Sequence, residues 1–347
     1  MIWNLAIAVG TAAILVASAH PGSAVEIPAV QWHEDLGRGI VAAPCVDGDI
    51  CIVPVVDGKI VAVDIAQGRI RWKRKPVRSL VMSPVLVGEG IYAAGAHGRD
   101  GVFRMDRSSG RVLWRVSREG AFSGLCAVGK AVIAVQTGGV IICLEQETGD
   151  LRWSRSASSL ILSSPVALES RVLIPTIGDS LYCFAVKDGG MVWGVEIRGG
   201  VAGSPVVVED TLFVVGQAGG ISALSVEDGT TLWHRETGDH FVAGPVCGSP
   251  GLFLVSVEGR IRRLDSSGGD TVWCRNLGTV LRAPPALASG EVVAGTVAGD
   301  LVALDEGTGE IRWEMSLHGG IEAPVVEVGG WVVVGTDRGD LYAVSAH

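Results

Sequence analysis

The sequence contains none of the short motifs that mark the common catalytic and metal-binding sites. In its 347 residues there is no P-loop, no G-x-S-x-G, no H-E-x-x-H, no C-x-x-C and no EF-hand pattern. Each of these motifs sets a phosphate cradle, a nucleophile or a group of metal ligands in a fixed local geometry. Their absence excludes the nucleotide-binding, hydrolase, metalloprotease, redox and calcium-binding classes that are defined by them.

Charged residues are also scarce. They make up 19% of the chain, and 28 basic against 37 acidic residues give a formal net charge of -9. A protein that binds nucleic acid regardless of sequence needs a positive surface to face the phosphates. The charge balance therefore argues against a nucleic-acid partner, although it identifies no other partner.

One long hydrophobic run is present, at the N-terminus. Residues 2–19 carry no charge and end in Ala17-Ser18-Ala19, a small-x-small pattern typical of signal-peptide cleavage, and cleavage after Ala24 is also compatible. The first four residues lack Lys and Arg, so an uncleaved membrane anchor is the alternative. Because the first cysteine is Cys45, lipid attachment of the bacterial lipoprotein kind is excluded. We expect residues 1–24 to be a signal peptide or an N-terminal anchor, and the protein to be exported to the periplasm or the cell exterior.

The chain is strongly repetitive. Eight of its ten tryptophans recur at spacings of 40, 42, 39, 40, 40, 40 and 40 residues. They are Trp32, Trp72, Trp114, Trp153, Trp193, Trp233, Trp273 and Trp313. A glycine lies four residues before seven of them, at Gly68, Gly110, Gly149, Gly189, Gly229, Gly269 and Gly309. A period near 40 residues indicates a repeat architecture.

Each repeat predicts four short β-strands and no helix. The apolar runs are short, rich in Val and Ile, and bounded by Gly and Asp turns. In the second repeat the strands are predicted at 84–87, 91–94, 102–105 and 112–116. Because one four-stranded sheet cannot bury both of its faces, the repeats must stack around a common axis. The predicted fold is all-β, an eight-bladed β-propeller of four-stranded blades over residues 25–347.

The two ends of the repeat region complement each other. The first tryptophan strand, residues 30–36, has no three strands before it, and the last three strands, from Pro324 to Val344, have no fourth. We therefore expect the N-terminal strand to join the last blade, which closes the ring and removes a free strand edge. A ring closed in this way is expected to be monomeric.

The seven cysteines do not imply a disulfide framework, because their number is odd. Cys45 and Cys51 flank a turn. A three-residue loop would set them opposite each other and allow a bridge, whereas a two-residue loop would place them on opposite faces. Cys143 and Cys183 occupy the same position in neighbouring repeats, where we expect separate, buried, apolar side chains.

Two segments show the repeat in its most regular form. They read Ala-Leu-Asp-Glu-Gly-Thr-Gly-Glu-Ile-Arg-Trp at 303–313 and Leu-Glu-Gln-Glu-Thr-Gly-Asp-Leu-Arg-Trp at 144–153. From Ala29 onward the chain resembles the pyrroloquinoline-quinone (PQQ) propeller family; WD40 blades would end in Trp-Asp, which does not occur, and kelch repeats are longer. The family contains quinoprotein dehydrogenases and also non-catalytic propellers, including the lipoprotein that assists outer-membrane β-barrel assembly. The resemblance implies the fold, and function must be argued from the site.

The dehydrogenases of this family bind PQQ with a calcium ion held by carboxylate and amide oxygens, beside an adjacent Cys-Cys disulfide and a catalytic Asp. Here no two cysteines are adjacent, and Asn276 is the single asparagine after the N-terminal segment. Those enzymes also enclose their cofactor with long insertions, whereas this repeat stays within two residues of 40. We therefore expect no catalytic residue, no metal and no cofactor, and PQQ with calcium only under the alternative of an oxidoreductase.

The repeated residues have structural explanations. Each glycine before a tryptophan is expected to adopt the left-handed conformation in the turn that precedes the outer strand. Aspartates at the start of this turn are expected to accept hydrogen bonds from its backbone amides; they are Asp64, Asp106, Asp265 and Asp305. Each repeat tryptophan is expected to dock against the adjacent blade and to donate its indole N–H there.

One position of the innermost strand breaks the repeat pattern. Eight residues after each tryptophan an apolar residue recurs: Ile40, Leu80, Phe122, Ile161, Val201, Phe241, Leu281 and Ile321. One residue further the series reads Val41, Val81, Ser123, Leu162, Ala202, Val242, Arg282 and Glu322. Charges close to the crowded axis must be paired or hydrated. Arg282 and Glu322 are therefore an ion pair near the closure, ligand contacts in the channel mouth, or solvent-exposed charges.

Loops that join outer to inner strands, and those that join second to third strands, should share one face. That face would carry Arg78, His97, Arg99, Arg118, Arg198, His240, Arg282, His318 and Glu322. Such a locally basic funnel could hold an anion, and solvated loop charges are the alternative. The candidates for ligand or partner binding are Arg78, Arg118, Arg198, His240, Arg282 and Glu322.

The sequence favours an exported, non-catalytic propeller that serves as a protein-binding or scaffold module in the cell envelope. Short loops and exposed blade edges form a recognition surface, because propellers accept peptides by loop contacts or by strand addition. The first alternative is a PQQ-dependent quinoprotein oxidoreductase, and the second is a propeller that binds a small anion or a carbohydrate. Membrane contact is expected only through an uncleaved N-terminal segment.

Overall fold

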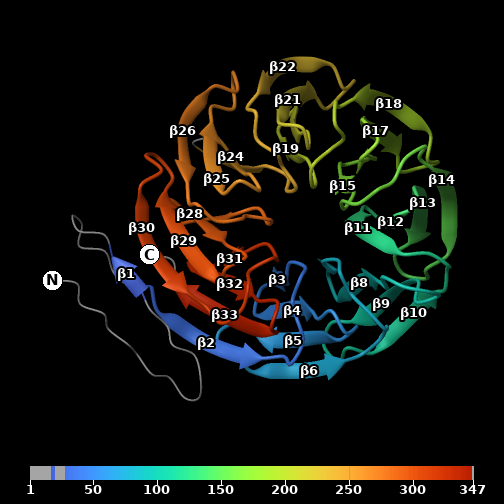
Figure 1. Ribbon diagram of the computed structural model, residues 1–347. Coiled ribbons are helices and arrows are strands. Elements are labelled where there is room, and N and C mark those ends of the chain that lie inside the picture. Colours follow the sequence, from blue (N-terminus) through green and yellow to red (C-terminus); the bar gives the residue numbers. More distant parts are fainter. Residues whose placement is uncertain (1–16, 20–27, 250, 346–347) are drawn as a thin grey trace.

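The computed structural model describes residues 17–19, 28–249 and 251–345, and every helix or strand assigned in that part of the chain is a β-strand. The strands form eight antiparallel sheets arranged as a ring (Figure 1). The predicted eight-bladed, all-β propeller of four-stranded blades is confirmed. The single departure is a fifth strand added to one blade.

Each blade runs from the axis to the rim. The innermost strands are β3 (Cys45–Asp47), β7 (Val85–Val87), β11 (Phe122–Val128), β15 (Val166–Ala167), β19 (Val206–Val208), β23 (Val246–Gly248), β27 (Ala286–Ala288) and β31 (Val326–Val328). The second strands are β4 (Ile50–Pro54), β8 (Gly90–Ala94), β12 (Ala131–Gln136), β16 (Arg171–Pro175), β20 (Thr211–Val215), β24 (Gly251–Val255), β28 (Glu291–Gly295) and β32 (Trp331–Gly335). The third strands are β5 (Ile60–Asp64), β9 (Val102–Asp106), β13 (Val140–Glu145), β17 (Ser180–Ala185), β21 (Gly220–Ser225), β25 (Arg260–Leu264), β29 (Asp300–Asp305) and β33 (Asp340–Ser345). The outer strands are β6 (Ile70–Arg74), β10 (Val112–Val116), β14 (Leu151–Ser156), β18 (Met191–Glu196), β22 (Thr231–Glu236), β26 (Thr271–Asn276), β30 (Ile311–Ser316) and β2 (Val30–Asp35).

The blade built from the second repeat shows how closely the apolar pattern sets the strands. Its four strands, β7 to β10, agree with the predicted bounds to within one residue at each end. Second strands such as β4 are buried along their whole length, whereas the outer strand β14 buries Trp153 and exposes the other five residues. The hydrophobic core therefore lies between neighbouring blades, as eight buried clusters around the ring.

The repeat tryptophans join adjacent blades. The indole N–H of Trp193 donates to the backbone carbonyl of Val226 in the next blade at 3.2 Å, and six other repeat tryptophans make the equivalent bond. Trp313 donates instead to Glu291 Oε2 at 3.0 Å. The glycine of the next blade lies directly under the ring: at Gly229, with φ +76°, an added Cβ would lie 2.8 Å from Trp193 Cε3. Glycine is thus required both by the turn and by the packed indole.

The turn before each outer strand is closed by its aspartate, as predicted. Asp106 Oδ1 accepts the backbone N–H of Ser109 at 2.8 Å, and Asp305 Oδ1 accepts that of Thr308 at 2.7 Å. Asp64 and Asp265 make the corresponding bonds. Because hydrogen bonds stabilise the ionised form, those from the Ser109 and Ser108 hydroxyls and the Ser109 amide lower the pKa of Asp106 to about 2.

The N-terminal strand closes the ring in the predicted way. β2 pairs antiparallel with β33, from Val30 opposite Val344 to Asp35 opposite Asp340, and lies beside it on the rim (Figure 1). Asp340 also accepts bonds from His33 Nε2 at 2.7 Å and from His318 Nδ1 at 2.8 Å. The closing strand is therefore held by side chains as well as by the backbone.

The fifth strand of one blade is β1 (Ala17–Ala19), which pairs antiparallel with the outer edge of β30. Ala17 lies opposite Met315 and Ala19 lies opposite Trp313. Most of residues 1–24 lie outside the described residues, so the prediction of a signal peptide or anchor stays a prediction. Within the described residues, no helix has the length and apolar character needed to cross a membrane.

The cysteines follow the two-residue-loop alternative. Asp47 pairs with Ile50, so Cys45 lies opposite Ile52 and Cys51 lies on the other face of the hairpin. Cys45 and Cys51 are both free thiols. Cys143 and Cys183 are fully buried and unbridged as expected, and burial raises the pKa of each thiol to about 11.

Candidate functional site

The inner ends of all eight blades enclose a channel of about 550 Å³ on the ring axis. The apolar residues eight positions after each tryptophan are at most 1% exposed, so they are packed in the protein interior, behind the residues that line the channel. The residues one position further line the channel in seven blades, and three of them, Val81, Leu162 and Val242, are about half exposed. The channel wall therefore combines aliphatic side chains with five serines and the charged residues Arg282 and Glu322.

Arg282 and Glu322 are brought together in this wall. Arg282 Nη1 lies 3.7 Å from Glu322 Oε1, and the two side chains are 58% and 39% exposed. The predicted ion pair is present, but both partners remain hydrated, so it contributes little to stability. Ligand binding by the two residues stays a prediction.

The other candidate residues are not gathered at the channel, whose lining does not include Arg78, Arg118, Arg198 or His240. His240 Nδ1 lies 2.7 Å from Glu258 Oε1. Although burial opposes it, hydrogen bonding by His240 lowers the pKa of Glu258 to about 2.

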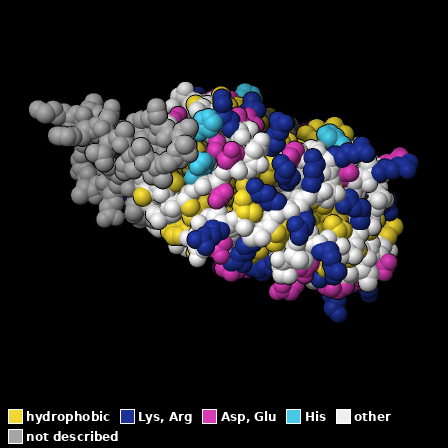
Figure 2. Space-filling model, turned by 90° about the horizontal axis from the view of Figure 1, so that it is seen from below, with side chains coloured by type: hydrophobic (Ala, Val, Ile, Leu, Met, Phe, Trp, Pro, Cys, Tyr) yellow, Lys and Arg dark blue, Asp and Glu magenta, His cyan; other side chains and the backbone are white. Residues whose placement is uncertain are grey.

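Acidic partners also neutralise part of the positive charge of the predicted basic funnel. Arg99 pairs with Glu119, and His318 pairs with Asp340. Over the described residues, Arg78, Arg118 and Arg198 make no ion pair. On the outer rim, which Figure 2 shows edge-on, Lys and Arg side chains lie among acidic and apolar ones.

The channel residues do not fit a calcium–quinone centre. Calcium takes six to eight oxygen ligands, usually with several carboxylates. The channel wall offers one carboxylate, Glu322, and it already faces Arg282. Across residues 17–19, 28–249 and 251–345, no three His, Cys, Asp or Glu side chains are placed to share a metal ion.

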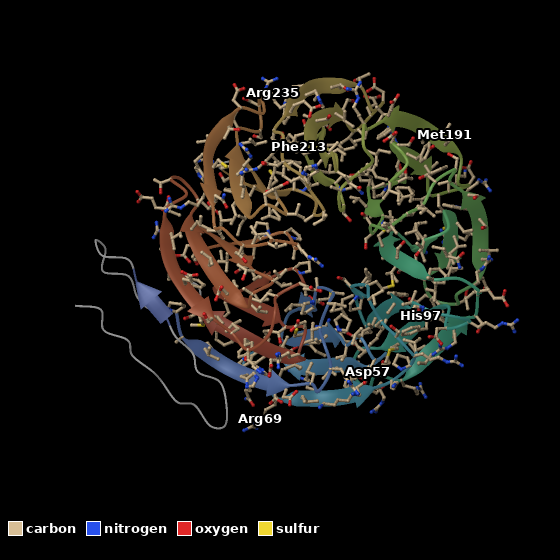
Figure 3. All side chains as sticks on the ribbon, viewed as in Figure 1. Asp57, Arg69, His97, Met191, Phe213 and Arg235 are labelled. Atoms are coloured by element: carbon tan, nitrogen blue, oxygen red, sulfur yellow. The ribbon has the colours of Figure 1, made fainter. Side chains whose placement is uncertain are left out.

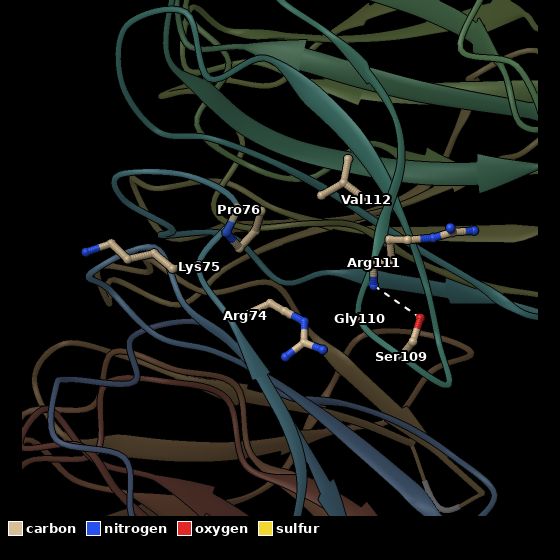
Figure 4. Close-up of a pocket in the computed structure, with 7 residues that line it drawn as sticks. All are labelled: Arg74, Lys75, Pro76, Ser109, Gly110, Arg111 and Val112. Atoms are coloured by element: carbon tan, nitrogen blue, oxygen red, sulfur yellow. Dashed lines mark hydrogen bonds between the residues drawn. The ribbon is translucent and has the colours of Figure 1, made fainter.

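A second hollow lies between the outer strand β6 and the turn before β10. It measures about 660 Å³ and is lined by Arg74, Lys75, Pro76, Ser109, Gly110, Arg111 and Val112. Its three cationic ends point away from one another (Figure 4). An anion site needs donors that converge on one point, so this hollow does not favour the small-anion alternative.

The outer strands of five successive blades expose apolar side chains just before the repeat tryptophan. We call these residues the apolar belt: Val112 and Leu113 on β10, Leu151 on β14, Met191 and Val192 on β18, Leu232 on β22, and Val272 on β26. Met191 is the most exposed, at 64%, and lies on the outer rim (Figure 3). In the described part of the chain, each of these five strands is the last strand of its sheet, with no further strand paired to its outer edge.

The remaining outer edges are different. On β6 the residue before the tryptophan is Arg71, which binds Asp49 and Asp64 at 2.6 Å, and on β30 it is Arg312, which pairs with Asp305. The belt strand β14 also has an arginine at this position, Arg152, which pairs with Glu145, and its exposed Leu151 lies one residue earlier. Sequence analysis did not single out the belt. The sequence shows only that Arg alternates with Leu or Val at the position just before the tryptophan. The three-dimensional order of the blades is needed to turn this alternation into a surface.

The chain matches the sequence profile of a family described as outer membrane protein assembly factor BamB, over residues 23–159, 98–176, 163–252 and 257–347. No curated protein sequence matches it.

Solved structures of the same architecture have very different sequences. BamB from Moraxella catarrhalis is 15% identical, with a TM-score of 0.77 over 92% of this chain and 99% of that one. A europium-containing methanol dehydrogenase is 12% identical, with a TM-score of 0.79 over 92% and 93%. The computationally designed Ika8 protein is 14% identical, with a TM-score of 0.81 over 90% and 98%. At these identities the likeness shows the fold alone, which a scaffold protein, an enzyme and a designed protein share.

Proposed function

This chain belongs to the family of the outer membrane protein assembly factor BamB, and from that premise we propose that it is an exported scaffold that binds a protein of the cell envelope. It docks an extended segment of that partner as an added strand at the outer edge of a blade of the apolar belt. The proposal is supported by the exposed surface of the outer strands rather than by the channel, which offers no convergent set of catalytic groups.

The belt is the observation that carries this proposal. Large apolar side chains are exposed on the outer strands of five adjacent blades. At the position just before the tryptophan, four of these blades carry Leu or Val, whereas Arg71, Arg152 and Arg312 form ion pairs there. Contiguous exposed apolar residues on a soluble domain mark interaction sites. Unpaired strand edges next to them supply backbone donors and acceptors to a partner strand.

Strand β1, which lies within the N-terminal segment expected to be a signal peptide or an anchor, illustrates the proposed mode of binding. It pairs with the outer edge of β30 (Ile311–Ser316), which lies far from it in the sequence. The edges of β10, β14, β18, β22 and β26 carry the same backbone arrangement and, within the described residues, no added strand. A partner strand that alternates apolar and polar residues would place its apolar side chains against the belt.

A defined peptide tests the mode of docking. We expect a ten-residue peptide of alternating Val and Thr to bind the parent protein, and the same peptide with Pro at every second position to fail, because Pro cannot donate to a strand edge. The double variant Met191→Asp, Leu232→Asp should lose binding. Gln31→Asp, on β2 at the repeat position of Leu232, should retain peptide binding. Equal binding by both variants would place the peptide elsewhere.

A cross-linking experiment tests the partner. A photoreactive amino acid at position 232 should capture an envelope polypeptide, whereas the same group at position 31 should not. Capture at neither position, or equally at both, would contradict the scaffold. Dye reduction together with bound-quinone absorbance after addition of PQQ and calcium would favour the oxidoreductase instead.

A further inference from the structure

One blade of the ring has a pocket on its outer strands. It measures about 570 Å³ and lies between the end of β18 and the adjacent strands β21 and β22. Ile197 and Arg198 line it from one side, and Gly220, Ser222, His234 and Glu236 from the other. A volume of this size accepts a small molecule.

The pocket exists because this blade carries small residues at positions that other blades fill. Ser222 pairs across the strands with His234, the residue that follows Trp233. At the position of Ser222 the other seven blades carry larger residues: Val61, Phe103, Ile142, Tyr182, Arg262, Val302 and Tyr342. Gly220 contributes as well, because a Cβ there would lie 3.0 Å from His234 Cε1 and crowd the imidazole.

Three side chains in the pocket form one hydrogen-bonded line. His234 Nδ1 lies 2.9 Å from Ser222 Oγ, and His234 Nε2 lies 3.1 Å from Glu236 Oε1. An ionised carboxylate can only accept, so Glu236 fixes the proton of the neutral ring on Nε2. Nδ1 then presents its lone pair to the Ser222 hydroxyl. A nucleophile, a base and a group that orients the base thus lie in one hydrogen-bonded row, as nucleophilic catalysis requires.

We propose that this pocket hydrolyses small carboxylic esters, with Ser222 as the nucleophile. Ser222 Oγ attacks the ester carbonyl while its proton passes to His234 Nδ1, and the C–O bond to the alcohol breaks as that proton passes to the leaving oxygen. Water then attacks the acyl-Ser222, giving its proton to His234 and releasing the carboxylic acid as the serine regains a proton. The net reaction is ester plus water to acid plus alcohol.

Two further features of the pocket suit this reaction. Ser222 is 8% exposed, so the reacting oxygen is largely shielded from bulk water while it lines the pocket. Arg198 lines the same pocket and makes no ion pair within the described part of the chain, so its charge can stabilise the developing oxyanion. Ile197, Gly216 and Ala218 complete a wall that suits a short acyl group. No belt residue lines this site, although Leu232 lies between its lining residues Thr231 and His234 on β22. The inference does not rest on the scaffold proposal.

The experiment uses the full chain, a fluorophosphonate probe that phosphonylates activated serines, and p-nitrophenyl acetate. We expect a covalent adduct at Ser222, located by mass spectrometry, and ester turnover that Ser222→Ala abolishes. His234→Gln should slow labelling by about 10²-fold or more, since general base catalysis contributes on that scale. Glu236→Gln should slow it less. Ser316→Ala is the matched control, because Ser316 Oγ bonds Asp300 at 2.7 Å with no imidazole beside it.

The readouts separate catalysis from folding. Each variant is compared with the parent by its melting temperature before activity is measured. Ser222→Ala should leave this temperature nearly unchanged, because it removes a single oxygen atom. Gly220→Ala gives a second test, because it displaces the imidazole while leaving all three reacting side chains in the chain. An adduct on another serine, no adduct at all, or undiminished turnover by Ser222→Ala would overturn the proposal.

Discussion

At the scale of single residues, the ring is held by pairs of tryptophan and glycine from neighbouring blades. Trp193 is 8% exposed and covers Gly229 of the next blade. We expect Trp193→Ala to lower the free energy of unfolding by about 3–5 kcal/mol, because it removes a large aromatic ring from a packed interface. Denaturant titration measures the change. Met191→Ala, on the same strand but in solvent, should cost far less, and equal losses would show that the indole is not a docking element.

Arg282 and Glu322 lead to a different expectation because both are hydrated. Replacing both with Val, which matches other blades, should leave the melting temperature within about two degrees of the parent, since exposed ion pairs contribute roughly 0–1 kcal/mol. If the pair contacts a ligand in the channel, the double variant should fold but lose envelope-partner capture. Unchanged stability together with unchanged capture would remove both residues as candidates and leave Arg78, Arg118, Arg198 and His240.

At the scale of elements, the turns before the outer strands make stability depend on acid pH. Hydrogen bonding to Arg312 is the largest cause that lowers the pKa of Asp305 to about 2, and the pKa of Asp106 is also about 2. The unfolded value is near 4, so these contributions are complete at neutral pH and are lost as the pH falls from about 4 to about 2. In Asp305→Asn the melting temperature should fall less over this range. Asp270→Asn, whose parent side chain is 81% exposed, should follow the parent curve.

The same elements show what the sequence could predict. Tryptophan spacing and alternating apolar residues predicted the strands, the turn aspartates and the closure by residues 30–36, because all of these repeat or complete a repeat. The line Ser222–His234–Glu236 was not predicted, since it depends on the pairing register of β21 with β22. The apolar belt was missed for a similar reason, because its residues are about 40 apart in sequence and lie on adjacent blades only once the blades are set in a ring. The sequence predicts that His240 binds a ligand or is a solvated loop charge, and it does not show that Glu258 from the next hairpin pairs with it.

At the scale of the whole molecule, the stability of the ring depends on the strand pair that closes it. Seven blades are continuous in sequence, whereas the eighth depends on β2 joining β33. Asp340 is 7% exposed and accepts bonds from His33 on the closing strand and from His318 in the loop after β30. His33 also stacks on Tyr342 with 4.6 Å between ring centroids. One carboxylate thus connects the closing strand to the blade that it completes.

Asp340→Asn tests this closure. An amide cannot accept two bonds through both of its polar atoms, so one histidine loses its acceptor, at a cost of about 1–3 kcal/mol for a buried polar group left unpaired. We expect amide hydrogen exchange to accelerate first in β2 and β33, because local opening starts where the ring is not covalently continuous. Asp300→Asn is the matched control at the same repeat position, where Ser316 is the partner and both neighbouring strands belong to one continuous blade. Its effect should stay within that blade. Exchange that accelerates equally around the whole ring in both variants would mean that the closure opens only with global unfolding, and that the N-terminal strand is no weaker than any other part of the propeller.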